Sequence, residues 1–215
     1  MFGREIKNFG ATMDLTFERP IAFAPGLFES VVDRLCSAVG FRVPADQIRV
    51  RHSDVLYQYD MHAAFFGGHG TFHRTAERMT FSLMNGQNRD DVRLILNLMW
   101  KFGREFLSEF QAPARFAVSI NVDAGTSQER DEFLSRFAAS PLVYSPGAIG
   151  YVKCDPYKEP IRVSVEPAVN APEAVFVYLV VNLPGRDDFD VLMEETMLAF
   201  ESAAKEFDIH LALSE

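Results

Sequence analysis

The sequence predicts an α+β protein in which a β-α-β-β-β-α unit is duplicated, giving an antiparallel sheet with helices packed on one face. The strongest observation is the segment 89–110, where apolar residues recur at steps of three and four, the spacing of an amphipathic helix. A second such segment spans 186–207, and both begin with Arg-Asp-Asp and end with Glu-Phe in the same register. The third observation is a series of short segments before each helix in which apolar and polar residues alternate, as in strands.

The first half is expected to contain a strand, a helix, three strands and the first long helix. These elements are expected at 11–23, 27–39, 48–51, 55–66, 72–84 and 89–110. Residues 1–10 are expected to be a loosely held lead-in. Gly40 is placed to end the first helix, because glycine readily adopts the left-handed conformation of a C-cap.

A glycine-rich segment, Gly67-Gly68-His69-Gly70, is expected to close a hairpin between the strands at 55–66 and 72–84. The register that best matches side chains places Phe66 opposite Phe72, which sets Asp60 against Arg78. A slip by one residue would set two carboxylates against each other, so this register is the one expected.

The second half repeats the same order of elements. They are expected at 115–123, 127–139, 148–154, 161–168, 174–183 and 186–207, with the tail 208–215 as a candidate edge strand. The two repeats would span 11–110 and 114–215. Because only residues 111–113 join them, we expect the repeats to pack as one pseudo-twofold unit.

This order of elements resembles the duplicated fold of the TATA-box-binding protein, a saddle of curved sheet with helices on its convex side. The resemblance covers element order over most of the chain and no residue motif. That family binds DNA through a basic, apolar concave face, and this acidic chain departs from it. No functional residue is therefore carried over from the resemblance, since a fold does not by itself imply a function.

Composition indicates which partners and compartments to expect. Acidic residues outnumber basic ones by 30 to 21, for a formal charge of −9, which argues against nucleic acid and anionic membranes as partners. The N-terminus has no apolar signal segment, and no stretch approaches the length of a membrane span. Cys36 and Cys154 are distant and lack disulfide-framework spacing, so a reduced, cytoplasmic protein is expected.

Seven polar residues on the expected sheet face form the candidate ligand-binding set: Asp60, His62, Arg74, Arg78, Asn121, Arg162 and Glu166. Strand alternation places Asp60 and His62 on one face, and the expected register places Arg74 and Arg78 beside them on the partner strand. The other three lie across the expected pseudo-twofold axis. The set suits a small anionic or polar ligand, and the alternative is a solvated face whose surface ion pairs contribute little.

No catalytic residue, cofactor or metal site is indicated by spacing. Three histidines, His62, His69 and His73, come close in sequence, but His69 falls in the expected turn and His73 is expected on the face opposite His62. The glycine-rich turn lacks the Lys-Ser/Thr of a phosphate-binding loop. No cofactor is therefore expected.

Two classes of function remain open at this point. The first is a non-enzymatic binding module of unknown ligand, using the polar sheet face or the acidic surface, which would suit a basic protein partner. The second is an enzyme acting on a small polar or anionic molecule, with acid–base chemistry at His62. The exposed edges of the sheet allow a homodimer in either case.

Overall fold

The computed structural model describes residues 5–106, 114–138, 146–184 and 189–213. Nine strands form one antiparallel sheet in the order β2-β3-β4-β5-β1-β6-β9-β8-β7. The strands are β1 (Ile6–Thr16), β2 (Ile48–His52), β3 (Tyr59–Phe65), β4 (Gly70–Thr75), β5 (Arg78–Gly86), β6 (Ala114–Asp123), β7 (Ala148–Val152), β8 (Ile161–Pro167) and β9 (Ala174–Leu183). Strands β1 and β6 pair at the centre, so the two halves of the chain share one sheet.

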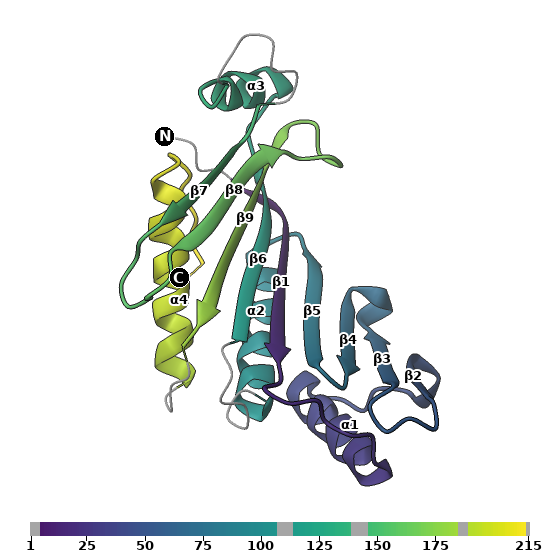
Figure 1. Ribbon diagram of the computed structural model, residues 1–215. Coiled ribbons are helices and arrows are strands. Elements are labelled where there is room, and N and C mark those ends of the chain that lie inside the picture. The colour runs from purple at the N-terminus through teal and green to yellow at the C-terminus, as the bar shows by residue number, and fades with distance from the viewer. Residues whose placement is uncertain (1–4, 107–113, 139–145, 185–188, 214–215) are drawn as a thin grey trace.

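The helices lie behind the sheet and at its two ends in the view of Figure 1. Within the described residues they are α1 (Pro25–Val39), α2 (Arg89–Phe106), α3 (Ser127–Ser135) and α4 (Phe189–Lys205), with short 3-10 turns η1 (Ala45–Gln47) and η2 (Phe66–Gly68). Helix α2 packs against β1 and β5, and α4 packs against β8 and β9, while α1 packs beside α2 at one end. The expected α+β class, an antiparallel sheet with helices packed against it, is confirmed.

Alternation along the strands explains the layer between sheet and helices. In β1 the apolar side chains Phe9, Met13 and Leu15 are fully buried, and the residues between them point to the other face. Aromatic rings join the layers: Phe81 of β5 stacks on Phe102 of α2, with ring centres 4.2 Å apart. In the second half Phe116 of β6 stacks on Phe200 of α4 at 5.9 Å.

The ends of the helices follow from local sequence signals. Gly40 ends α1 with a left-handed φ of 79°, and its N–H bonds the carbonyl of Cys36, as expected from the sequence. Thr126 caps α3, accepting a hydrogen bond from the N–H of Glu129 at 3.1 Å. Helices α2 and α4 occupy the two long amphipathic segments, and the expected residues 107–110 and 186–188 lie outside the described part of the chain.

The internal duplication is not confirmed. The segment 72–84, expected as one strand, forms parts of both β4 and β5, so the first half has five strands and the second has four. The chain reverses at Ala76-Glu77, where Thr75 Oγ1 accepts hydrogen bonds from the N–H groups of Glu77 and Arg78, each at 3.3 Å. A threonine hydroxyl replaces the glycine or proline that normally marks such a turn.

The hairpin register expected from side-chain matching is also wrong. Ala63, not Phe66, lies opposite Phe72, and His62 lies opposite His73. Asp60 of β3 lies opposite Thr75 of β4. Arg78 belongs to β5, two strands from β3, and lies opposite Thr16 of β1, so the expected Asp60–Arg78 pair does not form. The register differs because η2 occupies Phe66–Gly68, so the chain already reverses after Phe65, which lies opposite Gly70.

Both ends of the chain differ from expectation as well. Residues 6–10, expected as a loose lead-in, belong to the central strand β1. The tail forms no strand over its described residues 208–213, and β2 and β7 are the edges of the sheet. Over the ranges described, no helix combines the length and apolar character needed to cross a membrane.

Candidate functional site

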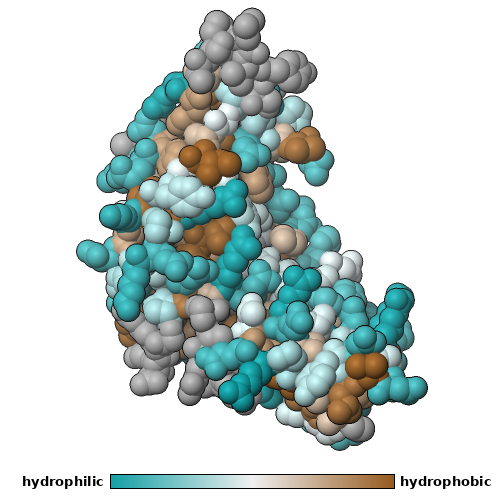
Figure 2. Space-filling model, in the orientation of Figure 1, coloured by the Kyte–Doolittle hydropathy of each residue, from teal (hydrophilic) through white to brown (hydrophobic). Residues whose placement is uncertain are grey.

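The face of the sheet turned away from α2 and α4 is covered by none of the described helices, and we call it the open face. It is turned toward the viewer in Figures 1 and 2, where its surface is mostly hydrophilic with separate apolar patches. Since side chains alternate, this face carries every second residue of each strand. From β1 and its neighbours β5 and β6 it includes Asn8, Gly10, Thr12, Asp14, Thr80, Ser82, Arg115, Ser119 and Asn121.

Five arginines lie on the open face: Arg49, Arg51, Arg78, Arg115 and Arg162. None of the five forms an ion pair within the described structure. Their guanidinium groups keep their full positive charge available to a ligand. Arginine forks match phosphate and carboxylate geometry, so the open face offers several such groups to an anionic partner.

The carboxylates of the open face are mostly occupied. Asp14 accepts a hydrogen bond of 2.7 Å from Thr80 Oγ1, and Asp60 lies 3.2 Å from His73 Nε2. Asp123 is 3.7 Å from the ammonium of Lys7 and also accepts from the N–H of Gly125. Asp14 keeps its charge, because a hydroxyl donor does not neutralise a carboxylate. The strands of this face carry five arginines and the four carboxylates of Asp14, Asp60, Asp123 and Glu166, so the local charge is slightly positive, whereas the chain as a whole carries −9.

Two nearly parallel aromatic rings of β9 lie on the open face. The ring centres of Phe176 and Tyr178 are 6.4 Å apart, with 11° between their planes. Arg115 Nη2 donates to the hydroxyl of Tyr178 at 3.5 Å, which places a guanidinium at the edge of the aromatic pair. On the edge strand β7, Tyr151 is 67% exposed and lies opposite Arg162.

Two polar atoms beside these rings are buried without a hydrogen-bond partner. They are Nε of Arg162 and Oγ of Ser164, both on β8. Ser164 lies opposite Tyr178, so both atoms belong to the open face. A buried donor without an acceptor is costly, and an acceptor atom supplied by a ligand would remove that cost.

A cleft of about 330 Å³ opens on the same face beneath the loop that joins β8 to β9. Figure 2 shows the surface hollowed below the tip of this loop. The cleft is lined from β1, β6, β9 and β8 by Asn8, Asn121, Phe176 and Glu166, and its sides are formed by Met84, Ser119, Pro167, Val169 and Asn170.

A glycine on β1 shapes one side of this cleft. A Cβ on Gly10 would lie 2.3 Å from Met84 Sδ and 2.9 Å from Ser119 Oγ. The missing side chain lets Met84 of β5 reach across β1, where its sulfur accepts a hydrogen bond from Ser119 Oγ at 4.0 Å. Met84 thereby forms a wall of the cleft.

The structure separates the candidate residues predicted from the sequence into three groups. Asn121 and Glu166 line the cleft, and Arg162 lies beside it on β8. Asp60, His62 and Arg78 lie on the open face but toward the β2 side of the sheet.

Arg74 is the exception and was misplaced. It is 2% exposed and lies on the helix-facing side of β4, where its guanidinium is 5.0 Å from the ring centre of Phe17. The wrong hairpin register placed it beside Asp60. The same error put His73 on the face opposite His62, whereas the two are direct partners on the open face. No group of three or more metal-binding side chains occurs in the ranges that the structure describes.

The sequence-based reasoning missed Arg49, Arg51, Arg115, Phe176 and Tyr178. Alternation along 115–123 and 174–183 contained part of the signal, because Arg115 and Asn121 share a parity, as do Phe176 and Tyr178. Alternation does not predict the order of the strands in the sheet, and it is this order that places β6, β9 and β8 side by side.

No known protein family model matches the chain, and no curated protein matches it by sequence. Among solved structures, the chain is similar to a rolling circle replication initiator protein from Geobacillus stearothermophilus, at 11% identity and a TM-score of 0.38. The match covers 95% of this chain and 84% of that one. At this TM-score the likeness supports no inference about the activity of this chain.

The expectation of a non-enzymatic module, or an enzyme for small molecules, with no nucleic-acid partner is withdrawn because of how charge is distributed over the surface. The exclusion of nucleic acid was drawn from the net charge of −9. Net charge averages over the whole surface, whereas the open face carries five arginines without ion pairs among the described residues.

Proposed function

We propose that the protein binds single-stranded nucleic acid across the open face of its sheet. The observation that carries this proposal is the five open-face arginines without an ion-pair partner in the described chain, two of which, Arg115 and Arg162, flank the parallel rings of Phe176 and Tyr178. A positively charged surface that follows the backbone, combined with aromatic rings on which bases stack, is the arrangement by which proteins bind single strands.

The division of roles follows from the chemistry of the side chains. Arg115 and Arg162 flank the rings and would contact phosphates, and the unpartnered Nε of Arg162 would find its acceptor there. Phe176 and Tyr178 would stack bases, which requires unpaired bases and so favours a single strand over a duplex. Arg49, Arg51 and Arg78 extend the positive surface toward the β2 edge.

The experiment is fluorescence anisotropy with labelled 20-mers of single-stranded DNA and RNA, measured over a series of salt concentrations. Each phosphate neutralised on a single strand contributes about −0.7 to the slope of log affinity against log salt, so five contacts would give about −3.5. Arg115→Ala with Arg162→Ala should make the slope about 1.4 less steep. Alanine at Phe176 or Tyr178 should weaken binding by about 1–3 kcal/mol without changing the slope.

Arg93→Ala is the matched control. Arg93 is an exposed arginine on α2, behind the sheet, and its removal changes the net charge by one, as does each of the single variants Arg115→Ala and Arg162→Ala. It should leave affinity for the strand within error of the wild type. Absence of salt-dependent binding to either DNA or RNA at 50 mM salt would overturn the proposal, as would an equal effect of Arg93→Ala.

A further inference from the structure

Four side chains form a straight row across the cleft of the open face. Asn8 lies opposite Asn121, Asn121 opposite Phe176, and Phe176 opposite Glu166. The row therefore crosses β1, β6, β9 and β8 at successive strand positions. Since neighbouring strands are about 4.8 Å apart, the backbones that carry Asn121 and Glu166 are separated by about 10 Å, with the ring of Phe176 between them.

The polar side chains of this row, and that of Asn170 beside it in the cleft, are available to a ligand. Over the described ranges, the side chains of Asn8, Asn121, Asn170 and Glu166 make no hydrogen bond or ion pair with other residues. Among the described residues Glu166 thus has no such partner, in contrast to Asp14, Asp60 and Asp123. A cleft of about 330 Å³ is at the lower end of the size range of small-ligand pockets, which suits a single planar ring system.

The charge of Glu166 decides which part of a nucleotide can enter. An ionised carboxylate accepts hydrogen bonds and donates none, so it repels phosphate and favours a group with N–H donors. Asn121 can both donate and accept, and the face of Phe176 offers a stacking surface. The cleft is therefore suited to a base and not to the backbone.

We propose that this cleft holds one base of the bound strand and prefers guanine, an inference that rests on the proposed function. Guanine presents two neighbouring N–H donors, N1–H and the N2 amino group, to the two oxygens of Glu166. With the purine lying over Phe176, its O6 and N7 acceptors point toward the amide of Asn121. Adenine, cytosine and thymine each lack one of the two adjacent donors, so each leaves a carboxylate oxygen without a partner.

The test is the affinity of the wild-type protein for four 12-mers of deoxythymidine that differ in one central nucleotide, dG, dA, dC or dT. The strand with dG should bind about five- to one-hundred-fold more tightly than the others, the discrimination expected of a bidentate base contact. Glu166→Gln should remove this preference, so that the four strands bind with equal affinity, because the glutamine amide replaces an acceptor with a donor.

Asp60→Asn is the matched control, since it makes the same change of charge on the open face outside the cleft. It should retain the preference for dG. Equal affinity of the wild type for all four strands would overturn the base preference and leave the proposed function standing. Failure to bind any of the four, together with failure to bind the RNA 20-mer, would overturn both. A preference for dG that survives Glu166→Gln would show that the cleft does not read the base.

Discussion

The guanidinium of Arg74 lies 5.0 Å from the ring centre of Phe17, on the buried side of β4. Its Nε donates to the hydroxyl of Tyr59 at 3.5 Å, and its Nη1 is 3.9 Å from the sulfur of Met79. No carboxylate of the described residues pairs with it. A buried cation held by an aromatic face and weak acceptors recovers part of its hydration energy and leaves the rest as a cost.

We expect Arg74→Met to leave the free energy of unfolding unchanged or to raise it, because methionine fills a similar volume without a buried charge. Arg74→Ala should lower it by about 2–4 kcal/mol through the cavity it creates. Urea denaturation followed by circular dichroism measures both. A methionine variant less stable than the wild type by more than about 2 kcal/mol would show that the charge itself is required.

The stack of Phe81 on Phe102 predicts a large effect of truncating the helix side of the core. Phe102 is 0% exposed, and its ring centre is 4.2 Å from that of Phe81 and 4.6 Å from that of Phe106. Phe102→Ala should therefore cost about 3–5 kcal/mol in the free energy of unfolding. Leu94→Ala, at a site 56% exposed on the same helix, is the control and should change it by less than about 0.5 kcal/mol. Similar losses in the two variants would contradict this packing.

Helix α2 meets α4 through a glycine. A Cβ on Gly103 would lie 2.0 Å from Cζ of Phe189, so the ring of α4 packs directly on the backbone of α2. Gly103→Ala would normally favour a helix by about 1 kcal/mol, but here we expect a loss of stability because the ring must move.

A double-mutant cycle separates these two effects. Gly103→Ala combined with Phe189→Ala should be more stable than the sum of the two single changes predicts, since the alanine at 189 removes the clash. The measurement is denaturation of the wild type and the three variants. Additive effects would mean that the two residues do not contact each other.

The parts of the fold that the sequence predicts correctly are those determined by residues close together in the chain. The amphipathic pattern of 89–106 and the cap at Gly40 are local, and both appear where expected. The turn at Ala76-Glu77 has no glycine or proline, because a threonine hydroxyl satisfies its backbone N–H groups. Because the sequence predicts no turn there, it predicts one strand where β4 and β5 form, and the predicted hairpin register is wrong.

The candidate site shows the same limit more strongly. Asn121 and Glu166 were selected from alternation alone and do share the cleft. Their relation to Asn8 and Phe176 depends on which strands are neighbours, and pairing between β1 and β6 joins residues more than 100 positions apart. The prediction for Arg74 failed for the same reason, since the register differs by three residues, and any odd difference transfers a side chain to the other face of the sheet.

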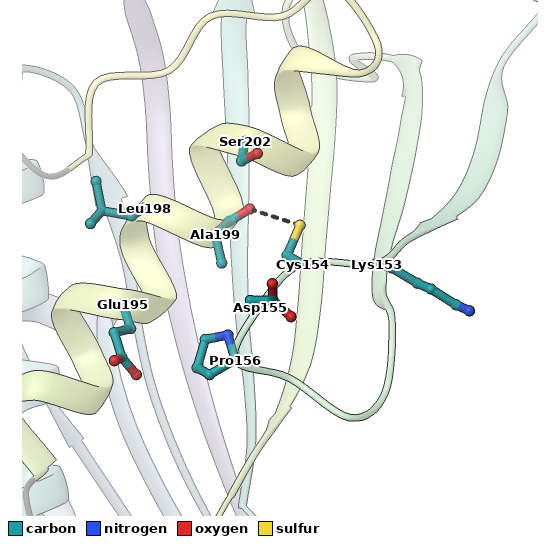
Figure 3. A pocket seen from close by; sticks show the side chains of 8 residues that line it. All are labelled: Lys153, Cys154, Asp155, Pro156, Glu195, Leu198, Ala199 and Ser202. Atoms are coloured by element: carbon teal, nitrogen blue, oxygen red, sulfur yellow. Dashed lines mark hydrogen bonds between the residues drawn. The ribbon is translucent and has the colours of Figure 1, made fainter.

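Cys154 has a thiol whose reactivity the structure predicts to be low. It lies at the end of β7 against α4, beside a cleft of about 500 Å³, and its Sγ donates to the carbonyl of Ala199 at 3.7 Å (Figure 3). Burial raises the pKa of the Cys154 thiol above its ordinary value, and the negative charge of Glu206 raises it further. The hydroxyl of Ser202 acts in the opposite direction and is the weaker influence of the three.

A raised pKa means a smaller thiolate fraction at every pH below it, and the thiolate is the nucleophile. In a Cys36→Ser background, alkylation of Cys154 by iodoacetamide at pH 7.5 should be slower than that of an unstructured cysteine peptide, and should keep increasing with pH after the peptide has reached its plateau. Glu206→Gln should speed the reaction at pH 7.5, because it removes a charge that opposes ionisation. Protein unfolded in urea provides the control for intrinsic reactivity. A rate at pH 7.5 equal to that of the peptide would contradict the raised pKa and would mean that the thiol ionises as freely as in water.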